Sequence, residues 1–385
     1  MSSDRAGYCR WHRLAALVAI LTSTVLAGCR GSVVPPLRKT VTEVAVDVAS
    51  SATPAVPQLT ATAEADPETA FTPIPQPLPK VSGLTDAQVA SLASLEKIDD
   101  YPLYVMHVYG DAAPVSAHPV RDSSAMPAFA CSLFAAFGDA ETRLYGRNYD
   151  WDYSPALMLY THPDDGYDSV SMVDLGFYLS EADARSLADV SLSQRRRLLE
   201  MVWHPFDGMN DQGLAIGMAA VPDSEVLSDP DLPAVGSLAI MREILDHAAD
   251  VDEALAVMRG VSIDMTGGPQ IHYLIADATG RAVLVEYYEG ERVVLPDTGG
   301  WHLATNHFRT PLNERVTFNC ARYVRLDEVL TATEGCLTPE SAMDLLSDVA
   351  QSSTQWSVVY DMARRQVHVA MGRDYGKVYV LGVEE

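Results

Sequence analysis

The chain has 385 residues, of which 48% are hydrophobic, 21% charged and 8% aromatic. This composition is ordinary for a folded protein and excludes a disordered, collagen-like or disulfide-scaffold chain. With 27 Lys and Arg against 52 Asp and Glu, the formal net charge is −25. Such a charge repels phosphate backbones, so nucleic acid is not an expected partner.

The N-terminus has the features of an export signal. Arg5, Arg10 and Arg13 form a positive region, and residues 14–26 form an apolar run too short for a comfortable membrane span. The sequence Leu-Ala-Gly-Cys then ends at Cys29 and resembles the bacterial lipobox. The resemblance implies that 1–28 is a lipoprotein signal peptide and that Cys29 is lipidated, which holds the folded part at the cell membrane outside the cytoplasm. An uncleaved anchor, or an ordinary signal with an incidental cysteine, is the alternative.

Residues 29–80 differ in character from the rest of the chain, because prolines recur there among Thr, Ala and Val, and Phe71 is the only aromatic residue. Such a stretch cannot bury enough apolar surface to offset the cost of ordering it. We therefore expect an extended tether between the lipid and a folded region.

The folded region alternates short strands with pairs of helices, which indicates one α+β domain with helices packed on antiparallel sheets. Residues 81–130 are expected to form the folded part of a light segment, with one helix and one strand, that is either a pro-segment or a retained subunit. Residues 131–385 are expected to form the main domain. Helices are expected at 84–95, 187–201, 237–259, 321–330 and 339–349. Strands are expected at 101–109, 131–137, 143–150, 156–162, 169–177, 270–277, 282–288, 291–296, 356–361, 366–371 and 377–383.

Four separated motifs carry the chemistry. Cys131 opens a hydrophobic strand, and Arg147 and Asp150 follow it at offsets of 16 and 19 on the next strand. Asn210 lies in the segment Asp-Gly-Met-Asn-Asp-Gln-Gly-Leu, and Asn306 lies in Thr-Asn-His-Phe. The last motif, Ala-Arg-Tyr-Val-Arg, begins at Ala321.

In order and spacing these motifs resemble the choloylglycine hydrolase group of N-terminal-nucleophile hydrolases. That group includes penicillin V acylase, with acid ceramidase and the N-acylethanolamine acid amidases as more distant relatives. The resemblance implies an αββα sandwich, two mostly antiparallel sheets between helix layers. It also implies hydrolysis of linear, non-peptide amide bonds without a cofactor or a metal.

The resemblance assigns roles to the motif residues. Cys131 is the nucleophile, and Asp150 orients the terminal amine. Asn306 by its side chain and Asn210 by its backbone N–H stabilise the oxyanion. Arg322 supports the polar cluster, with Arg325 as the alternative.

Physical chemistry supports the same assignment. A thiol attacks an amide only as thiolate, so it needs a base and a positive neighbour such as Arg147. A terminal α-amino group, with a pKa of about 7.7–8.0, is a suitable base one residue from the thiol. Because Cys131 is internal, the Ala130–Cys131 bond must be cut first, most simply by the thiol itself through an N-to-S acyl shift. We expect a light segment from Cys29 to Ala130 that stays bound to a heavy segment beginning at Cys131.

Three questions stay open at the level of sequence. The acyl group and the amine of the expected small-molecule N-acyl amide are not determined, and neither is the oligomeric state. The chain could instead be an acyltransferase of the penicillin-forming type, or a tethered ligand-binding lipoprotein without catalysis. Cys320 and Cys336 could form a disulfide, although spacing alone does not establish the geometry.

Overall fold

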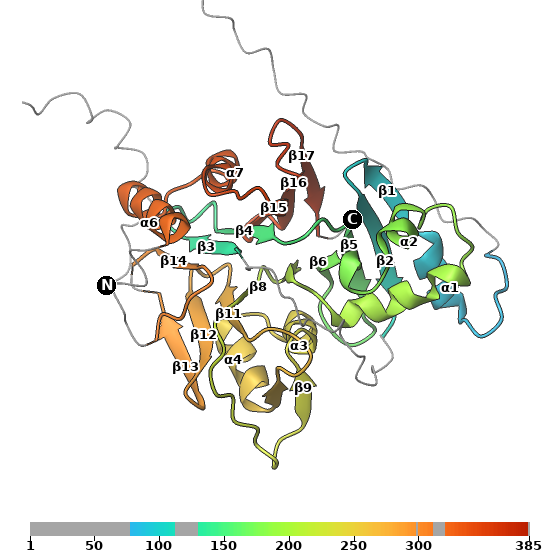
Figure 1. The fold of residues 1–385 in the computed structure, drawn as a ribbon, viewed down its shortest axis with the longest axis horizontal. Helices are drawn as coiled ribbons and strands as arrows, with labels where there is room; N and C mark the ends of the chain where they lie inside the picture. The colour runs from blue at the N-terminus through green and yellow to red at the C-terminus, as the bar shows by residue number, and fades with distance from the viewer. Residues whose placement is uncertain (1–77, 112–129, 298, 311–319, 384–385) are drawn as a thin grey trace, which may run out of the picture.

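The computed structural model describes residues 78–111, 130–297, 299–310 and 320–383. Within these ranges two large sheets pack face to face, and helices cover the outer face of each (Figure 1). This is the αββα arrangement, and the predicted α+β class is confirmed. The predicted signal peptide, Cys29 and nearly all of the tether lie outside the described residues. In the described part of the chain no helix has the length and apolar character needed to cross a membrane.

The six-stranded sheet carries the strand that follows Cys131. Its order is β14-β3-β4-β15-β16-β17, and all neighbours are antiparallel. The strands are β3 (Ser132–Ala136), β4 (Leu144–Asp150), β14 (Trp301–Ala304), β15 (Thr354–Asp361), β16 (Gln366–Met371) and β17 (Val378–Gly382).

Side-chain alternation along β3 shows how this sheet is held between two cores. Leu133 and Ala135 belong to the core between the sheets. Phe134 and Ala136 belong to the core beneath α6 (Ala321–Thr333) and α7 (Pro339–Asp348). Gly146 on β4 lies against the ring of Phe134, where a Cβ would come within 2.4 Å of ring carbons. A strand apolar on both faces, as β3 is, indicates a central strand.

The nine-stranded sheet has the order β1-β2-β5-β6-β7-β8-β11-β12-β13, antiparallel except between β2 and β5. Its strands are β1 (Glu96–Asp99), β2 (Leu103–Tyr109), β5 (Ala156–His162), β6 (Ser169–Asp174), β7 (Asp207–Asn210), β8 (Ala215–Ala220), β11 (Ile271–Ala276), β12 (Ala282–Tyr288) and β13 (Glu291–Pro296). Helices on its outer face are α1 (Asp86–Ala93), α2 (Glu181–Arg185), the 3-10 helix η4 (Gln194–Trp203), α3 (Ala239–His247) and α4 (Val251–Arg259). A short parallel pair, β9 (Ala234–Gly236) and β10 (Ser262–Asp264), stands apart.

Two predicted helices are wrong as single elements. The helix expected over 237–259 is divided between α3 and α4, because the side chain of Asp250 accepts the N–H of Glu253 and starts a new helix. The helix expected over 187–201 does not form as an α-helix: residues 187–193 are turns that follow α2, and 194–201 belong to the 3-10 helix η4. Ser186 and Ser191 lie between these elements and bond locally to Asp183 and Gln194, which competes with a continuous helix.

The part of the light segment that the structure describes, residues 78–111, contributes β1 and β2 to the large sheet rather than forming an appendage. All seven residues of β2 pair in register with β5, from Leu103 opposite Ala156 to Tyr109 opposite His162. Leu103 and Val105 lie in the core between the sheets. Tyr104 belongs to the core beneath α1 and η4. The apolar contacts of this segment are therefore those of a core strand.

Leu103→Ala tests this structural role. Leu103 is fully buried, and truncating such a side chain leaves a cavity that lowers the free energy of unfolding by about 2–5 kcal/mol. Denaturant unfolding measures the loss. Leu227→Ala is the matched control because Leu227 is 63% exposed, and equal effects of the two substitutions would contradict the assignment of β2 to the core.

Candidate active site

Cys131 lies directly before β3 and is 1% exposed. The register of β3 and β4 sets Ser132 opposite Asn148, so Cys131 lies across from the end of β4 that carries Arg147 and Asp150. The Nη2 atom of Arg147 is 3.8 Å from the Cys131 sulfur. The structure therefore brings the predicted nucleophile and its predicted cation together, in the core between the sheets.

Arg147 is fully buried and is held by groups from both sheets. Its Nη1 donates to the carboxylate of Asp207 on β7, and to the carbonyl of Phe206 at 2.7 Å. Trp356 and Tyr360 also donate to the Asp207 carboxylate. Burial alone would lower the pKa of Arg147, but the carboxylate of Asp207 and the thiol of Cys131 raise it above the ordinary value. The guanidinium beside the thiol is thus permanently charged.

Asp207 was not among the residues singled out from the sequence, although it lies in the same motif as Asn210. The signal that could have identified it is the requirement that a buried arginine have a hydrogen-bonded carboxylate partner.

Asp150 ends β4 and is 1% exposed. Its Oδ1 accepts the hydroxyl of Thr354, whereas its Oδ2 is buried with no hydrogen-bond partner among the described residues. Burial raises the pKa of this carboxyl to about 6, against the hydrogen bond from Thr354 and the charges of Arg322 and Arg147, which lower it. The site therefore contains a buried carboxylate oxygen that still lacks a donor.

Arg322 and Asn306 complete a connected cluster around Cys131. Arg322, in the first turn of α6, donates to the Cys131 carbonyl, to Ser132 Oγ at 2.9 Å and to Asn306 Oδ1 at 3.2 Å. Asn306 in turn donates from Nδ2 to the carbonyl of Ala220 at 2.8 Å. Arg325, the sequence alternative, is exposed and pairs with Asp348 at 2.6 Å. Of the two arginines, Arg322 is the one at the site.

Asn210 is not in contact with this cluster. Its backbone N–H donates to the carbonyl of Leu214 at 3.0 Å, and its side chain donates to the carbonyls of Leu245 and Ala248. These contacts close the turn between β7 and β8 and tie it to α3. They do not support the predicted role of its N–H as an oxyanion donor.

Ala220, at the end of β8, is a residue that sequence reasoning missed. The N–H of Val221 donates to the carbonyl of Gln270 at 2.9 Å. Because bonded and non-bonded pairs alternate in an antiparallel ladder, the N–H and C=O of Ala220, opposite Ile271, point away from β11. They face Asn306, whose amide reaches the Ala220 carbonyl. An alanine offers no polar side chain, so only the register reveals this position.

Other sequence-based expectations concern cysteines and metals. Cys320 is a free thiol, so the disulfide considered between Cys320 and Cys336 does not form. No group of three His, Cys, Asp or Glu side chains able to hold a metal ion occurs within the described residues.

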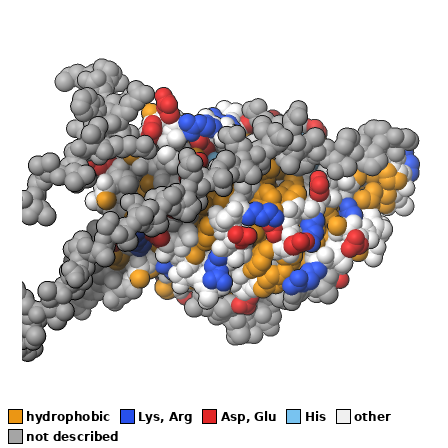
Figure 2. Space-filling view, turned by 90° about the horizontal axis from the view of Figure 1, so that it is seen from above, with side chains coloured by type: hydrophobic (Ala, Val, Ile, Leu, Met, Phe, Trp, Pro, Cys, Tyr) orange, Lys and Arg blue, Asp and Glu red, His pale blue; other side chains and the backbone are white. Residues whose placement is uncertain are grey.

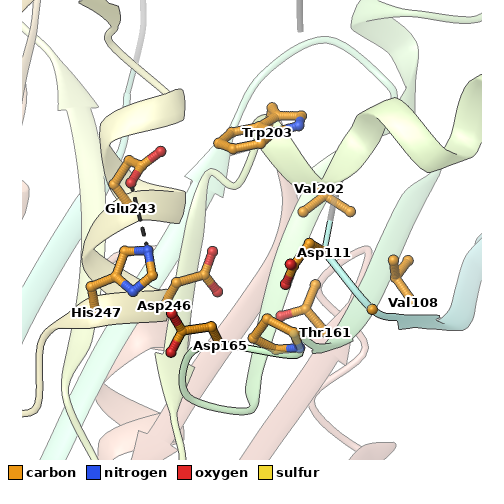
Figure 3. Close-up of a pocket in the computed structure, with 11 residues that line it drawn as sticks. Val108, Asp111, Thr161, Asp165, Val202, Trp203, Glu243, Asp246 and His247 are labelled. Carbon is orange, nitrogen blue, oxygen red and sulfur yellow. Dashed lines mark ion pairs between the residues drawn. The ribbon is translucent and has the colours of Figure 1, made fainter. Parts of the chain in front are cut away.

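A cavity of about 270 Å³ lies apart from this cluster (Figure 3). It is bounded by Val108, Thr161, Trp203 and two residues of α3, Glu243 and His247, which form an ion pair of 3.8 Å. None of the site residues predicted from the sequence lines it.

The surface drawn in Figure 2 carries Lys and Arg side chains interspersed with Asp and Glu, and hydrophobic side chains extend between them. This face offers no uniformly basic area of the kind that gathers phosphate backbones.

A four-layer αββα sandwich, in which a central strand begins at a buried cysteine paired with an arginine, defines the class as the N-terminal-nucleophile hydrolases. The sequence model of the family described as acyl-coenzyme A:6-aminopenicillanic acid acyl-transferase matches residues 138–374, more than half of the chain. The chain belongs to this family, within the choloylglycine hydrolase-like group of amide hydrolases and acyltransferases. No curated protein sequence matches it.

Several solved structures are similar in fold. Penicillin V acylase from Agrobacterium tumefaciens is 18% identical, with a TM-score of 0.47 over 66% of this chain and 87% of the other. A mutant of conjugated bile acid hydrolase from Clostridium perfringens is 14% identical, with a TM-score of 0.49 over 66% and 92%. A Caenorhabditis elegans N-acylethanolamine-hydrolyzing acid amidase ortholog is 12% identical, with a TM-score of 0.42 over 65% and 100%.

The pKa of Asp150 has a consequence for stability. Its ordinary value is 3.8 and its value in the fold is about 6, so between these pH values the folded chain holds a proton that the unfolded chain has released. The contribution of this proton to the free energy of unfolding is complete below pH 3.8. It is lost as the pH rises through 6, a decrease in stability of up to about 3 kcal/mol.

Asp150→Asn should remove this decrease, because an amide does not titrate. Unfolding free energies at several pH values between about 3.5 and 7.5, measured in a Cys131→Ala chain that lacks the thiol, test this. Asp152→Asn makes the same charge change at a neighbouring exposed position and should leave the decrease intact. Parallel pH dependences of Asp150→Asn and its parent would contradict the buried state of the carboxyl.

Proposed function

We propose that this protein hydrolyses a linear, non-peptide amide bond, with Cys131 as an N-terminal nucleophile and a thioester as the intermediate. The observation that carries the proposal is the Cys131 thiol 3.8 Å from the permanently charged guanidinium of Arg147, at the first residue before a central strand. Attack on a carbonyl requires the thiolate form, and a guanidinium at this distance gives the sulfur a positive counter-charge.

A nucleophile of this kind requires that the chain be cut before Cys131. The Cys131 thiolate attacks the Ala130 carbonyl, the C–N bond breaks, and the nitrogen takes up a proton to become the α-amino group of Cys131. Water then hydrolyses the thioester and releases the light segment's new carboxylate. The unpartnered Oδ2 of buried Asp150 supports this maturation, since a new ammonium beside it would supply the donor that the carboxylate lacks in the uncut chain.

The free α-amino group is the general base of the reaction. It removes the proton of the thiol, and Cys131 attacks the amide carbonyl of the substrate. The amine then departs with a proton from the same group, leaving a thioester. Water, activated by the amine, releases the carboxylic acid and regenerates the thiol.

The oxyanion of each tetrahedral intermediate needs donors that are already in place. Asn306 provides one, because its Nδ2 has two hydrogens and, among the described residues, donates only to the Ala220 carbonyl. The N–H of Ala220, which points away from β11, provides the second. Arg322 holds the Asn306 oxygen at 3.2 Å and thereby fixes the orientation of the amide.

Acyl transfer to an amine is the second candidate, favoured by the family whose description is acyl-coenzyme A:6-aminopenicillanic acid acyl-transferase. The two reactions share the thioester and differ in whether water or an amine resolves it. The relatives suggest a first panel of test substrates: penicillin V, a conjugated bile acid and an N-acylethanolamine. An N-acyl homoserine lactone is added to this panel. Product analysis with and without added 6-aminopenicillanic acid separates the two candidates.

We also propose, from the sequence, that residues 1–28 are removed, that Cys29 carries lipid, and that residues 29–80 tether the enzyme to the outer side of the cell membrane. The mass of the N-terminal fragment from detergent-solubilised membranes tests this. A fragment without lipid on Cys29 would overturn it.

Maturation is tested by the intact mass and N-terminal sequence of purified protein lacking the signal. We expect a heavy fragment beginning at Cys131 in the wild type and only the full-length chain in Cys131→Ala, because alanine has no nucleophile. Cys320→Ala is the matched control, since it removes the other free thiol found among the described residues, and it should still be cut. A wild-type chain that stays full length has no α-amino base, and the ligand-binding lipoprotein becomes the better description.

The two asparagines predicted from the sequence can be separated by kinetics. Asn306→Ala should lower kcat about 10²–10³-fold, as expected for loss of one oxyanion donor. Asn210→Ala should instead lower the stability and change kcat little, because its contacts are to backbone groups of the β7–β8 turn and α3. Steady-state kinetics on whichever panel amide the wild type cleaves, together with thermal unfolding, measure both. A larger loss of kcat in Asn210→Ala would reverse the assignment.

A further inference from the structure

A second free thiol lies at the start of α6, and the proposed mechanism does not use it. Cys320 is the N-cap residue of this 13-residue helix and is partly exposed. A thiolate at a helix N-terminus is stabilised by the partial positive charge there. A helix N-terminus alone does not define a reactive site, so the groups around the sulfur must be considered.

Two polar side chains from the segment after β14 lie against this thiol. Thr305 Oγ1 is 3.4 Å from the Cys320 sulfur and 2.9 Å from His307 Nδ1. His307 is 7% exposed, and its Nε2 is buried with no hydrogen-bond partner among the described residues. The ring of His307 packs edge-on against Tyr323, with centroids 5.2 Å apart. The sulfur therefore has a hydroxyl beside it that is linked to a buried imidazole, and one nitrogen of that imidazole is unsatisfied within the described part of the chain.

The electrostatics of the site favour the thiolate. Burial raises the pKa of Cys320, but hydrogen bonds from His307, Thr305 and the backbone of Tyr323, with the charge of Arg322, lower it to about 6. Among the described residues, His307 and Tyr323 are titratable neighbours of the sulfur and Arg322 is a charged one. At neutral pH the thiolate is therefore the main form, and peroxides react with thiolates.

We propose that Cys320 is a modification site at which a hydroperoxide oxidises the thiolate to a sulfenic acid. The sulfur attacks one peroxide oxygen, the O–O bond breaks, and hydroxide or alkoxide leaves and takes up a proton. The sulfur loses two electrons and the peroxide gains them. His307, Thr305 and the N-terminus of α6 supply donors for the new S–O group.

The position of Cys320 gives the modification a direct connection to the candidate active site. Arg322 lies two residues further along the same first helical turn and donates to the Cys131 carbonyl, Ser132 and Asn306. An added oxygen at the N-cap must be accommodated by this turn. The proposal itself concerns the chemistry of Cys320 and does not depend on the proposed amidase activity.

The first test is the pH dependence of alkylation. Purified protein receives short pulses of iodoacetamide between about pH 4.5 and 9.5, and peptide mapping reports labelling of Cys320 separately from that of Cys131. We expect a midpoint of about 6 in the folded protein and about 8.5 after denaturation. A midpoint of about 8 or above in the folded protein would overturn the proposal.

Two variants of one residue separate the site from a general effect on folding. Thr305→Val removes the hydroxyl and should lower the labelling rate at about pH 6 several-fold, whereas Thr305→Ser keeps the hydroxyl and should restore it. His307→Gln should also lower the rate of Cys320 labelling, as Thr305→Val does. Equal labelling of all three variants and the wild type would contradict the assignment of these partners.

The second test traps the product. Protein treated with hydrogen peroxide in the presence of dimedone should carry the dimedone adduct on Cys320, and the adduct should be absent from Cys320→Ser. The His307→Gln variant should accumulate it more slowly. Absence of the adduct from wild-type protein, under conditions in which free cysteine is trapped, would overturn the proposed oxidation.

Discussion

The buried ion pair between Arg147 and Asp207 is the interaction on which the rest of the site depends. Arg147 belongs to the six-stranded sheet and Asp207 to the nine-stranded sheet, so the pair joins the sheets across an otherwise apolar interface. Neither charge reaches water, and removing one partner of such a pair typically costs about 3–5 kcal/mol. Hydrogen bonds from Trp356 and Tyr360 satisfy the carboxylate. The fold thereby retains a cation beside Cys131 that a purely apolar core would not permit.

The remaining polar groups approach Cys131 from several elements and reach different atoms. Arg147 faces the sulfur, while Arg322 from α6 holds the carbonyl. Asp150 lies at the end of the neighbouring strand with one oxygen unsatisfied. Cys131 is thus the point at which the two sheets and a helix layer meet. This explains why side chains so distant in sequence converge on a single residue that is almost inaccessible in the uncut chain.

The sequence was informative where a local pattern determined the structure. Short strands such as 143–150 and 366–371 were predicted nearly as observed, and the offsets from Cys131 brought Arg147 beside it, since neighbouring antiparallel strands carry fixed registers. The predictions of two continuous helices were wrong because single side chains interrupt them. Asp250 caps a new helix, and the hydroxyls of Ser186 and Ser191 form local hydrogen bonds before η4. Ala220 and Asp207 could not be selected from local pattern, because one acts through its backbone and the other through a partner 60 residues away. Asn210 lies in a motif that predicted an oxyanion role, but its contacts are those of a turn residue.

The parallel pairing of β2 with β5 changes the molecularity of folding if the chain is cut before Cys131. In an uncut chain, unfolding and refolding are unimolecular and independent of concentration. In a cut chain, Leu103 and Val105 belong to a separate polypeptide, so a lost β2 returns only by association and stability acquires a dependence on protein concentration. The matured protein would then be protected mainly by slow unfolding, and an unfolded light segment that diffuses away would leave an exposed edge on the nine-stranded sheet.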